Sequence, residues 1–265
     1  KLHQSPEQAV AHLADVDGQL VRFLDSFSSW EQVLERNVCI LISDHGQTVI
    51  GESEDHNISL DALLRPFAVH AWGKEVTRDV EVVICNNERM CFLYPVNGGQ
   101  QSAIVDAVSV DERIDLIAWK EGEKVRVRRG GSKQELSFWR NGKYPDAYGC
   151  SWEIEGDPAV LDVQFDGETL AFDTYPDAFS RLYGAAFAQA DEVVILTASP
   201  GYEFLSECAP THLGGGSHGS LHKQDSLIPL VIAGAANSFP LPARLVDVKA
   251  FVLQELGIIS DVRPQ

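Results

Sequence analysis

Two histidine-bearing segments contain residue types suited to metal chemistry, and the first follows a short apolar segment. Residues 38–42 are apolar, and Ser43, Asp44, His45 and Gly46 come directly after them. Ligand sites in open α/β sheets lie beyond the carboxyl ends of the strands. A carboxylate beside an imidazole supplies two kinds of ligand that zinc and manganese accept. The segment therefore indicates a divalent-metal site, although an ordinary loop can carry the same residues.

The second segment places His218 among glycines. Gly216 and Gly219 lie on either side of it, and glycine lets the backbone approach a ligand closely. A phosphate-binding loop of the Walker type ends in Gly-Lys-Ser/Thr, which is absent here. The glycine setting therefore favours His218 as a metal ligand. For His212 and His222, a surface position and a ligand role both stay open.

Several regular elements are needed to position these residues. Segments 38–42, 193–196 and 227–233 are unbroken apolar runs. Because none of them alternates, each is expected to be buried on both faces, as in the centre of a parallel sheet. Apolar residues at three- and four-residue spacing predict amphipathic helices over 6–30 and 247–256. Buried strands alternating with helices indicate a layered α/β fold.

The middle of the chain has a different pattern, that of antiparallel hairpins. Residues 80–94 are predicted to form two strands joined at Asn86–Asn87. Residues 124–139 alternate between polar and apolar side chains, with Gly130–Gly131 at the turn. Such hairpins have one solvated face, which is where the basic residues of the second hairpin are expected to lie.

These two patterns suggest how the chain is organised. We expect residues 1–94 and 186–265 to form the α/β core. Residues 95–185 are expected to be an insertion or cap subdomain on that core.

The motifs resemble the metal-binding signature of the alkaline phosphatase superfamily, in its nucleotide pyrophosphatase/phosphodiesterase-like branch. The resemblance is carried by residues 43–46, by residues 216–220 and by the segment 225–230 that follows. It implies a three-layer α/β/α sandwich with a mostly parallel central sheet and a mixed or antiparallel insertion. It also implies a metal-dependent phosphoesterase, of the phosphodiesterase or nucleotide pyrophosphatase type, acting on a small phosphoester or nucleotide. Monoesterase and sulfatase activities stay open.

The same resemblance assigns roles to individual residues. Asp44 and His45 would bind one of two divalent ions and His218 the other, the ions being zinc or, alternatively, manganese. The Thr or Ser nucleophile and the remaining ligands of this family would lie upstream of Lys1. His3 is interpreted as a surface residue and not as a substitute ligand. We therefore expect a missing N-terminal segment or an oligomer, and the chain has no nucleophile that the motifs identify.

The composition limits the remaining possibilities. The chain has 265 residues, with 21 Lys and Arg against 39 Asp and Glu, and a formal net charge of −18. Binding a nucleic-acid polymer needs clustered cations, so that function is not expected. No apolar run approaches the length of a membrane span. Five scattered cysteines without a Cys-x-x-Cys pair favour a reduced compartment, the cytoplasm.

Other constellations predict structure more than chemistry. The chain has no Gly-x-Ser-x-Gly, so a nucleophile elbow is not expected. The acidic residues at 52, 54 and 55 and the basic run 124–129 are interpreted as solvated surfaces, the basic run with an anionic substrate as its alternative. The second function class is a non-catalytic truncated module that binds metal or pairs with a partner chain. Bound metal without phosphoester hydrolysis would distinguish it from the enzyme.

Overall fold

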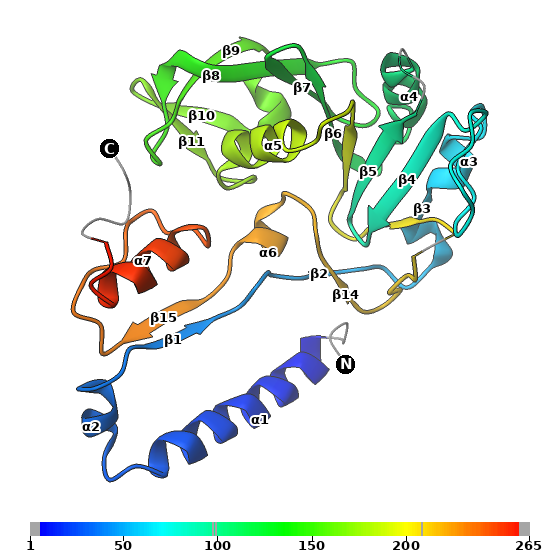
Figure 1. Cartoon of the computed structure of the whole chain (residues 1–265). Helices are drawn as coiled ribbons and strands as arrows, with labels where there is room; N and C mark the ends of the chain where they lie inside the picture. The colour runs from blue at the N-terminus through cyan, green and yellow to red at the C-terminus, as the bar shows by residue number, and fades with distance from the viewer. Residues whose placement is uncertain (1–5, 97, 99, 208, 260–265) are drawn as a thin grey trace. The chain divides into compact units, whose positions relative to one another are not determined.

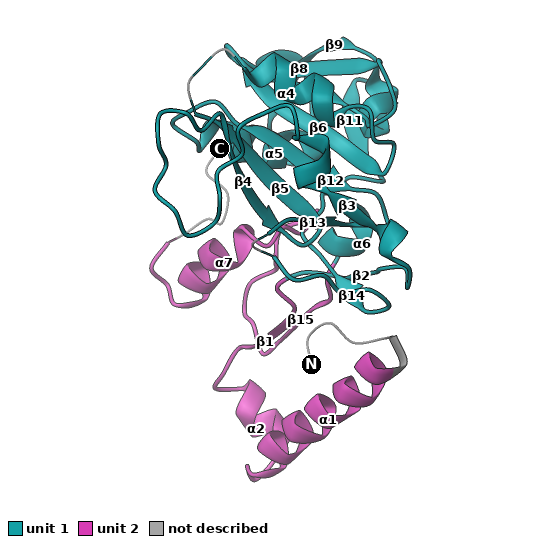
Figure 2. Ribbon diagram, turned by 90° about the vertical axis from the view of Figure 1, so that its right-hand side faces the viewer, with its two compact units in different colours: residues 1–6, 45–227 teal, residues 7–44, 228–265 magenta. Residues whose placement is uncertain are grey.

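The computed structural model describes residues 6–96, 98, 100–207 and 209–259. The chain divides into two compact units (Figure 2). Unit 1 contains His45–Leu227, and unit 2 contains Glu7–Asp44 together with the chain from Ile228 onward. Each unit is described by itself.

Unit 2 consists of helices and a two-stranded sheet. Its elements are α1 (Pro6–Asp25), α2 (Trp30–Leu34), β1 (Cys39–Ile42), β15 (Leu230–Ala233) and α7 (Asp247–Glu255) (Figure 1). Strands β1 and β15 pair antiparallel, with Cys39 opposite Ala233. The helices predicted over 6–30 and 247–256 are confirmed, the first ending earlier and followed by the short α2.

Unit 1 is built on a seven-stranded sheet in the order β4-β5-β12-β6-β7-β8-β9. The strands are β4 (Val82–Asn87), β5 (Met90–Pro95), β6 (Ile114–Glu121), β7 (Lys124–Arg128), β8 (Glu135–Pro145), β9 (Ser151–Gly156) and β12 (Val194–Ala198). Neighbouring strands pair antiparallel throughout. Both predicted hairpins are present, as β4–β5 and β7–β8.

Shorter elements surround this sheet. The helices are α3 (Leu60–Leu63), α4 (Gln101–Val108), α5 (Ala178–Phe187) and α6 (Lys223–Ser226), with 3-10 turns at Glu54–His56 and Pro158–Leu161. The short strands are β2 (Thr48–Val49), β3 (Asn57–Ser59), β10 (Val163–Asp166), β11 (Thr169–Phe172), β13 (Glu203–Leu205) and β14 (Gly216–Ser217). They pair as β2–β14, β3–β13 and β10–β11.

Two hydrophobic cores cover the two faces of the seven-stranded sheet. On β12, Ile195 belongs to the core that contains α5, whereas Val194 and Leu196 belong to the core that contains α4. Successive side chains of a strand point to opposite faces, so the two helices cover opposite faces. Strand β12 is therefore buried on both sides along its whole length.

The predicted mostly parallel α/β/α sandwich is wrong, because the main sheet is antiparallel. An unbroken apolar run indicates burial on both faces, and β12 has that burial through α4 and α5. The run carries no information on strand direction, which depends on the partner strands. Segment 38–42 differs again: β1 lies in a two-stranded sheet, and Leu41 is half exposed. Whether residues 95–185 act as a separate insertion stays a prediction.

The expectation that the chain has no membrane span is met within the described residues. None of the helices found there combines the length and the hydrophobicity that crossing a bilayer requires.

A buried carboxylate in β6 makes the stability of the fold depend on pH. Burial raises the pKa of Asp115 above its ordinary value of 3.8, against the opposing effects of the Tyr175 hydrogen bond and Arg129. The folded state then holds the proton more tightly than the unfolded chain. The stability contributed by Asp115 is complete below pH 3.8 and is lost as pH rises through the raised pKa.

We expect Asp115→Asn, which cannot ionise, to remove this pH dependence. Relative to the variant, the wild type should lose stability as pH rises above 3.8, which urea denaturation at one acidic and one neutral pH measures. The matched control is Asp111→Asn, because hydrogen bonds from Arg113 lower the pKa of Asp111 and give the opposite sign. Equal stability differences at both pH values for Asp115→Asn would contradict the prediction.

Candidate functional site

The structure brings His45 and His218 face to face. Their ring centroids lie 3.5 Å apart, and the ring planes differ by 21°. The cause is the antiparallel pairing of β2 with β14, in which Thr48 lies opposite Ser217. His45 precedes β2 and His218 follows β14, so the short ladder places the two imidazoles side by side. Two of the three predicted metal ligands therefore lie together within unit 1.

A ring nitrogen of each histidine lies close to an oxygen atom of the protein. Nδ1 of His45 lies 2.8 Å from the carbonyl oxygen of Gly46. Because a carbonyl can only accept, Nδ1 donates, and the lone pair of the ring is on Nε2. Nε2 of His218 lies 3.3 Å from Oε1 of Glu88, a contact that is an ion pair when the imidazole is protonated. Oxygen acceptors of these kinds orient the metal-binding histidines of proteins.

Two buried glutamates flank β14. Glu88 accepts hydrogen bonds from the backbone nitrogen of His218 at 2.9 Å and from the hydroxyl of Ser217 at 3.1 Å. Glu203 lies 3.0 Å from the same hydroxyl, so the two carboxylates share its single proton, and the imidazole of His212 lies 3.1 Å from Glu203. Two carboxylates near β14 give the site a negative character that suits a cation.

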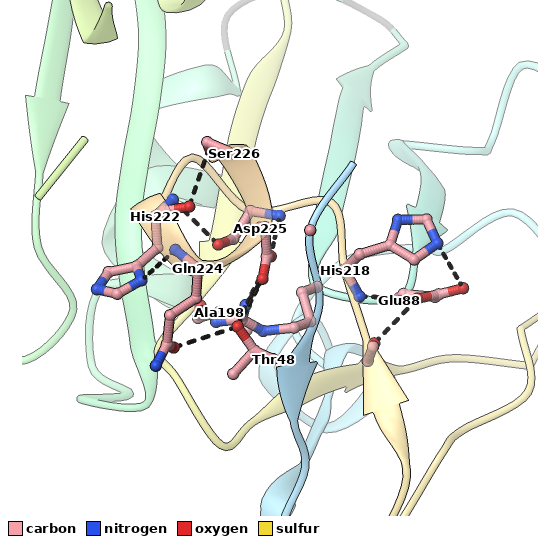
Figure 3. Close-up of polar contacts among 12 residues, drawn as sticks. Thr48, Glu88, Ala198, His218, His222, Gln224, Asp225 and Ser226 are labelled. Carbon is pink, nitrogen blue, oxygen red and sulfur yellow. Dashed lines mark hydrogen bonds and ion pairs between the residues drawn. The ribbon is translucent and has the colours of Figure 1, made fainter. Parts of the chain in front are cut away.

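A buried ion pair holds the segments that carry the site. The guanidinium of Arg89 contacts both carboxylate oxygens of Asp225, at 2.5 and 2.6 Å, and both side chains are fully buried. Arg89 also donates to the Thr48 hydroxyl at 2.7 Å and to the Ala198 carbonyl at 2.9 Å. Figure 3 shows these contacts beside those of Glu88. Burial lowers the pKa of Arg89, and the opposing effect of Asp225 is the largest of those that raise it.

Asp44, the third predicted ligand, belongs to the other unit. The boundary between the units falls between Asp44 and His45. Asp44 is exposed and accepts a hydrogen bond of 3.4 Å from the Ser43 hydroxyl. Its role as a metal ligand stays a prediction.

The two imidazoles fit part of the ligand set of a metal centre. Rings stacked face to face present one nitrogen in each plane, so each ring suits an ion of its own. Within the described residues, no group of three or more His, Cys, Asp or Glu side chains is arranged to hold a metal ion. A complete centre needs ligands beyond these two.

The other histidines considered as ligands have structural contacts. His212 lies against Glu203. His222 precedes α6, and its Nδ1 accepts a hydrogen bond from the backbone nitrogen of Gln224. Burial lowers the pKa of His222. His3 lies outside the described residues.

The basic run of the second hairpin forms the solvated face that the alternation predicted. On β7, Val125 and Val127 are fully buried. Arg126 and Arg128 are partly exposed and form ion pairs with Glu135 on β8. These arginines are therefore part of a surface network that holds the hairpin together.

Sequence reasoning missed Glu88 and Arg89. It placed the turn of the first hairpin at Asn86–Asn87, whereas the two strands are joined by Glu88 and Arg89. The available signal was a pair of charged residues inside a hairpin that is otherwise apolar on one side. Their partners lie far along the chain, at His218 and Asp225, so the sequence alone did not show what they contact.

The comparisons with known proteins found no match. No family model matches the chain, and neither the curated proteins nor the solved structures contain a match to it. The resemblance of the two motifs therefore rests on the residues of this chain alone.

Proposed function

We propose that this chain binds divalent metal ions through His45 and His218 and forms part of a metal-dependent phosphoesterase, a phosphodiesterase or nucleotide pyrophosphatase whose nucleophile is not among the residues that the motifs identify. The observation that carries the proposal is the stacking of the two imidazoles at 3.5 Å. Both residues were identified as ligands from separate motifs. Their meeting in the folded chain, through the pairing of β2 with β14, supports the assignment.

The residues of the chain have distinct tasks in this proposal. Bound divalent ions would hold the attacking and leaving oxygens of the ester and neutralise their charge. His45 would supply one ring nitrogen to one ion, and His218 would supply one ring nitrogen to the other. The carbonyl of Gly46 and the carboxylate of Glu88 orient the two rings. Because the protein is strongly acidic, an anionic substrate depends on the metal ions for attraction.

Metal binding tests the ligand assignment directly. We expect the 265-residue chain to bind zinc in isothermal titration calorimetry, and His45→Ala and His218→Ala each to weaken that binding. The loss should exceed the roughly 10–100-fold effect of removing a supporting residue. His56→Ala is the matched control, because His56 stacks on Tyr202, whereas His45 and His218 stack on each other. Zinc affinity in either histidine variant equal to that of the control would refute the assignment.

Hydrolysis assays test the reaction. With zinc or manganese present, the enzyme that includes the nucleophile should cleave bis-p-nitrophenyl phosphate faster than p-nitrophenyl phosphate and p-nitrophenyl sulfate, and its His218→Ala variant should lose this activity. A preference for the monoester or the sulfate would assign the site to one of the alternative esterases.

Exposed apolar residues of unit 2 favour the second function, a non-catalytic module that binds metal or pairs with a partner chain. On α1, Leu13 is 67% exposed and Phe23 is 56% exposed. Leu41 on β1 and Val231 on β15 are also exposed, and two-stranded sheets are rarely stable alone. Apolar surface of this kind marks sites of association. Zinc binding without cleavage of any of the three esters, together with a solution mass above that of one chain, would support this function.

A further inference from the structure

A pocket in unit 1 lies between α3, β4 and the segment that follows β13. Strand β13 packs against both α3 and β4, which lie at the same end of unit 1 (Figure 1). The pocket encloses about 280 Å³, including its open mouth. All of its lining residues belong to unit 1, and none of them belongs to the segments around His45 and His218. The pocket is therefore made of residues to which neither the sequence nor the candidate metal site gives a role.

Hydrogen bonds hold the walls of this pocket together. The backbone nitrogen of His70 donates to the carbonyl of Val82 at 2.9 Å, and Nε2 of His70 lies 2.9 Å from the carbonyl oxygen of Lys74. The backbone nitrogen of Trp72 donates to the carboxylate of Glu207 at 3.4 Å. The loop that carries His70 and Trp72 is thus tied both to the sheet and to the segment after β13. Ligand sites are usually formed in advance in this way.

The apolar part of the lining comes from Val69, Ile84 and Trp72. Val69 and Ile84 pack against the core that contains α4. Trp72 is different, because its side chain is 70% exposed although tryptophan is highly buried on average. The face of an indole ring attracts cations. An exposed indole at the edge of a pocket therefore offers a surface for a ligand that carries positive charge.

Two carboxylates complete the lining, those of Asp61 and Glu207. Both side chains are exposed, and within the described residues neither forms an ion pair with a cationic side chain. An ionised carboxylate only accepts hydrogen bonds, and an ammonium group only donates them. The chain also has a formal net charge of −18, which attracts cations and repels anions. Charge and hydrogen bonding therefore select the same kind of ligand.

We propose that this pocket binds a small organic cation, a primary ammonium group on a short apolar body. The ammonium group would donate to the carboxylates of Asp61 and Glu207, beside the indole of Trp72. The apolar body would contact Val69 and Ile84. The ligand must be small, because the volume of the pocket lies below the range of about 300–1,000 Å³ of most ligand sites. The inference does not rest on the proposed phosphoesterase function.

A titration with n-butylammonium chloride tests the binding, followed in ¹H–¹⁵N spectra of the 265-residue chain. The indole N–H signal of Trp72 and the backbone amide signal of Glu207 should shift and saturate. Sodium butyrate, with a chain of the same length and a negative charge, should leave both signals in place. Ionic strength is kept equal in the two titrations because salt screens exposed charges. Shifts that do not saturate, or equal shifts with butyrate, would overturn the inference.

Variants of the lining identify the groups that bind. Asp61→Asn and Glu207→Gln should each weaken butylammonium binding about tenfold, because each removes an ionised hydrogen-bond acceptor. Trp72→Ala should weaken it about two- to fivefold, read from the Glu207 amide, and Trp72→Phe should restore part of the loss. All of these side chains are exposed, so the fold should be unchanged by circular dichroism.

The matched control is Asp166→Asn, which removes the same charge from an exposed residue of β10 outside the pocket. This variant should bind butylammonium like the wild type. An equal loss in Asp166→Asn and Asp61→Asn would overturn the inference, because net charge alone would then explain the binding. Wild-type affinity in both Asp61→Asn and Glu207→Gln would also overturn it.

Discussion

Replacing Arg89 with methionine is expected to lower the free energy of unfolding by about 3–5 kcal/mol. Methionine keeps much of the apolar stem but leaves the carboxylate of Asp225 buried without its counter-charge. The variant also removes the donors to Thr48 and Ala198, which tie β2 and the end of β12 to the turn. The expected loss is therefore large for a single residue. Urea denaturation followed by tryptophan fluorescence measures it.

Two controls distinguish buried charge from charge in general. Lys124 forms an ion pair of 2.7 Å with Glu155, but their side chains are 39% and 67% exposed. Lys124→Met should therefore cost no more than about 1 kcal/mol. A double variant, Arg89→Met with Asp225→Leu, should recover part of the loss because no unpaired charge stays buried. A cost for Arg89→Met as small as that of Lys124→Met would show that the pair does not hold the fold.

Replacing Trp152 with alanine is expected to cost about 3–5 kcal/mol. Trp152 lies on β9, is fully buried, and packs edge to face against Phe138 and Phe179 at centroid distances of 5.7 and 5.5 Å. Its indole nitrogen donates to the carboxylate of Asp146 at 2.7 Å. The variant creates a cavity in the core beneath α5 and removes that donor. Circular dichroism in urea measures the change without depending on the lost fluorophore.

The matched controls for this prediction are a second tryptophan and a second substitution. Trp72 is 70% exposed, so Trp72→Ala should change stability by no more than about 0.5 kcal/mol. Trp152→Phe keeps a buried ring and loses the hydrogen bond, so its cost should lie between those of the two alanine variants. Similar costs for Trp152→Ala and Trp72→Ala would contradict the assignment of Trp152 to the core.

Local patterns predicted some of the elements of this protein. The spacing of apolar residues located α1 and α7, and alternation located the hairpins β4–β5 and β7–β8. These signals are local because the periods of a helix and of a strand follow from how successive side chains are arranged along each element. The turn between β4 and β5 lies two residues later than predicted, since the pair at Glu88–Arg89 has none of the residues that typify such turns.

These local patterns did not predict how the strands are arranged in the sheet. The unbroken apolar segment at β12 was interpreted as a strand of a parallel sheet, but β12 pairs antiparallel with β5 and with β6. A strand covered by helices on both faces has the same composition in either direction. Direction is decided by the order in which distant strands pair, and that order is a property of the whole sheet.

For the candidate site as well, the sequence identified residues but not the contacts between them. Residue types and glycine context identified His45 and His218, each from its own segment. The sequence did not show that β2 and β14 would pair and stack the two rings. Nor did it show Glu88 against His218, a contact between residues 130 positions apart, or Arg89 against Asp225, 136 positions apart.

By itself, then, the sequence determined the acidic character of the protein, the helices α1 and α7 and the hairpins β4–β5 and β7–β8, and it singled out the two histidines. The tertiary structure alone decided the antiparallel order of the sheet, the stacking of those histidines, and the carboxylate and the ion pair that hold them. The physical reason is the separation along the chain over which each kind of interaction acts. Helix and turn preferences act over a few neighbouring residues, whereas strand partners and buried charges are selected by contacts between segments that meet only when the chain has folded.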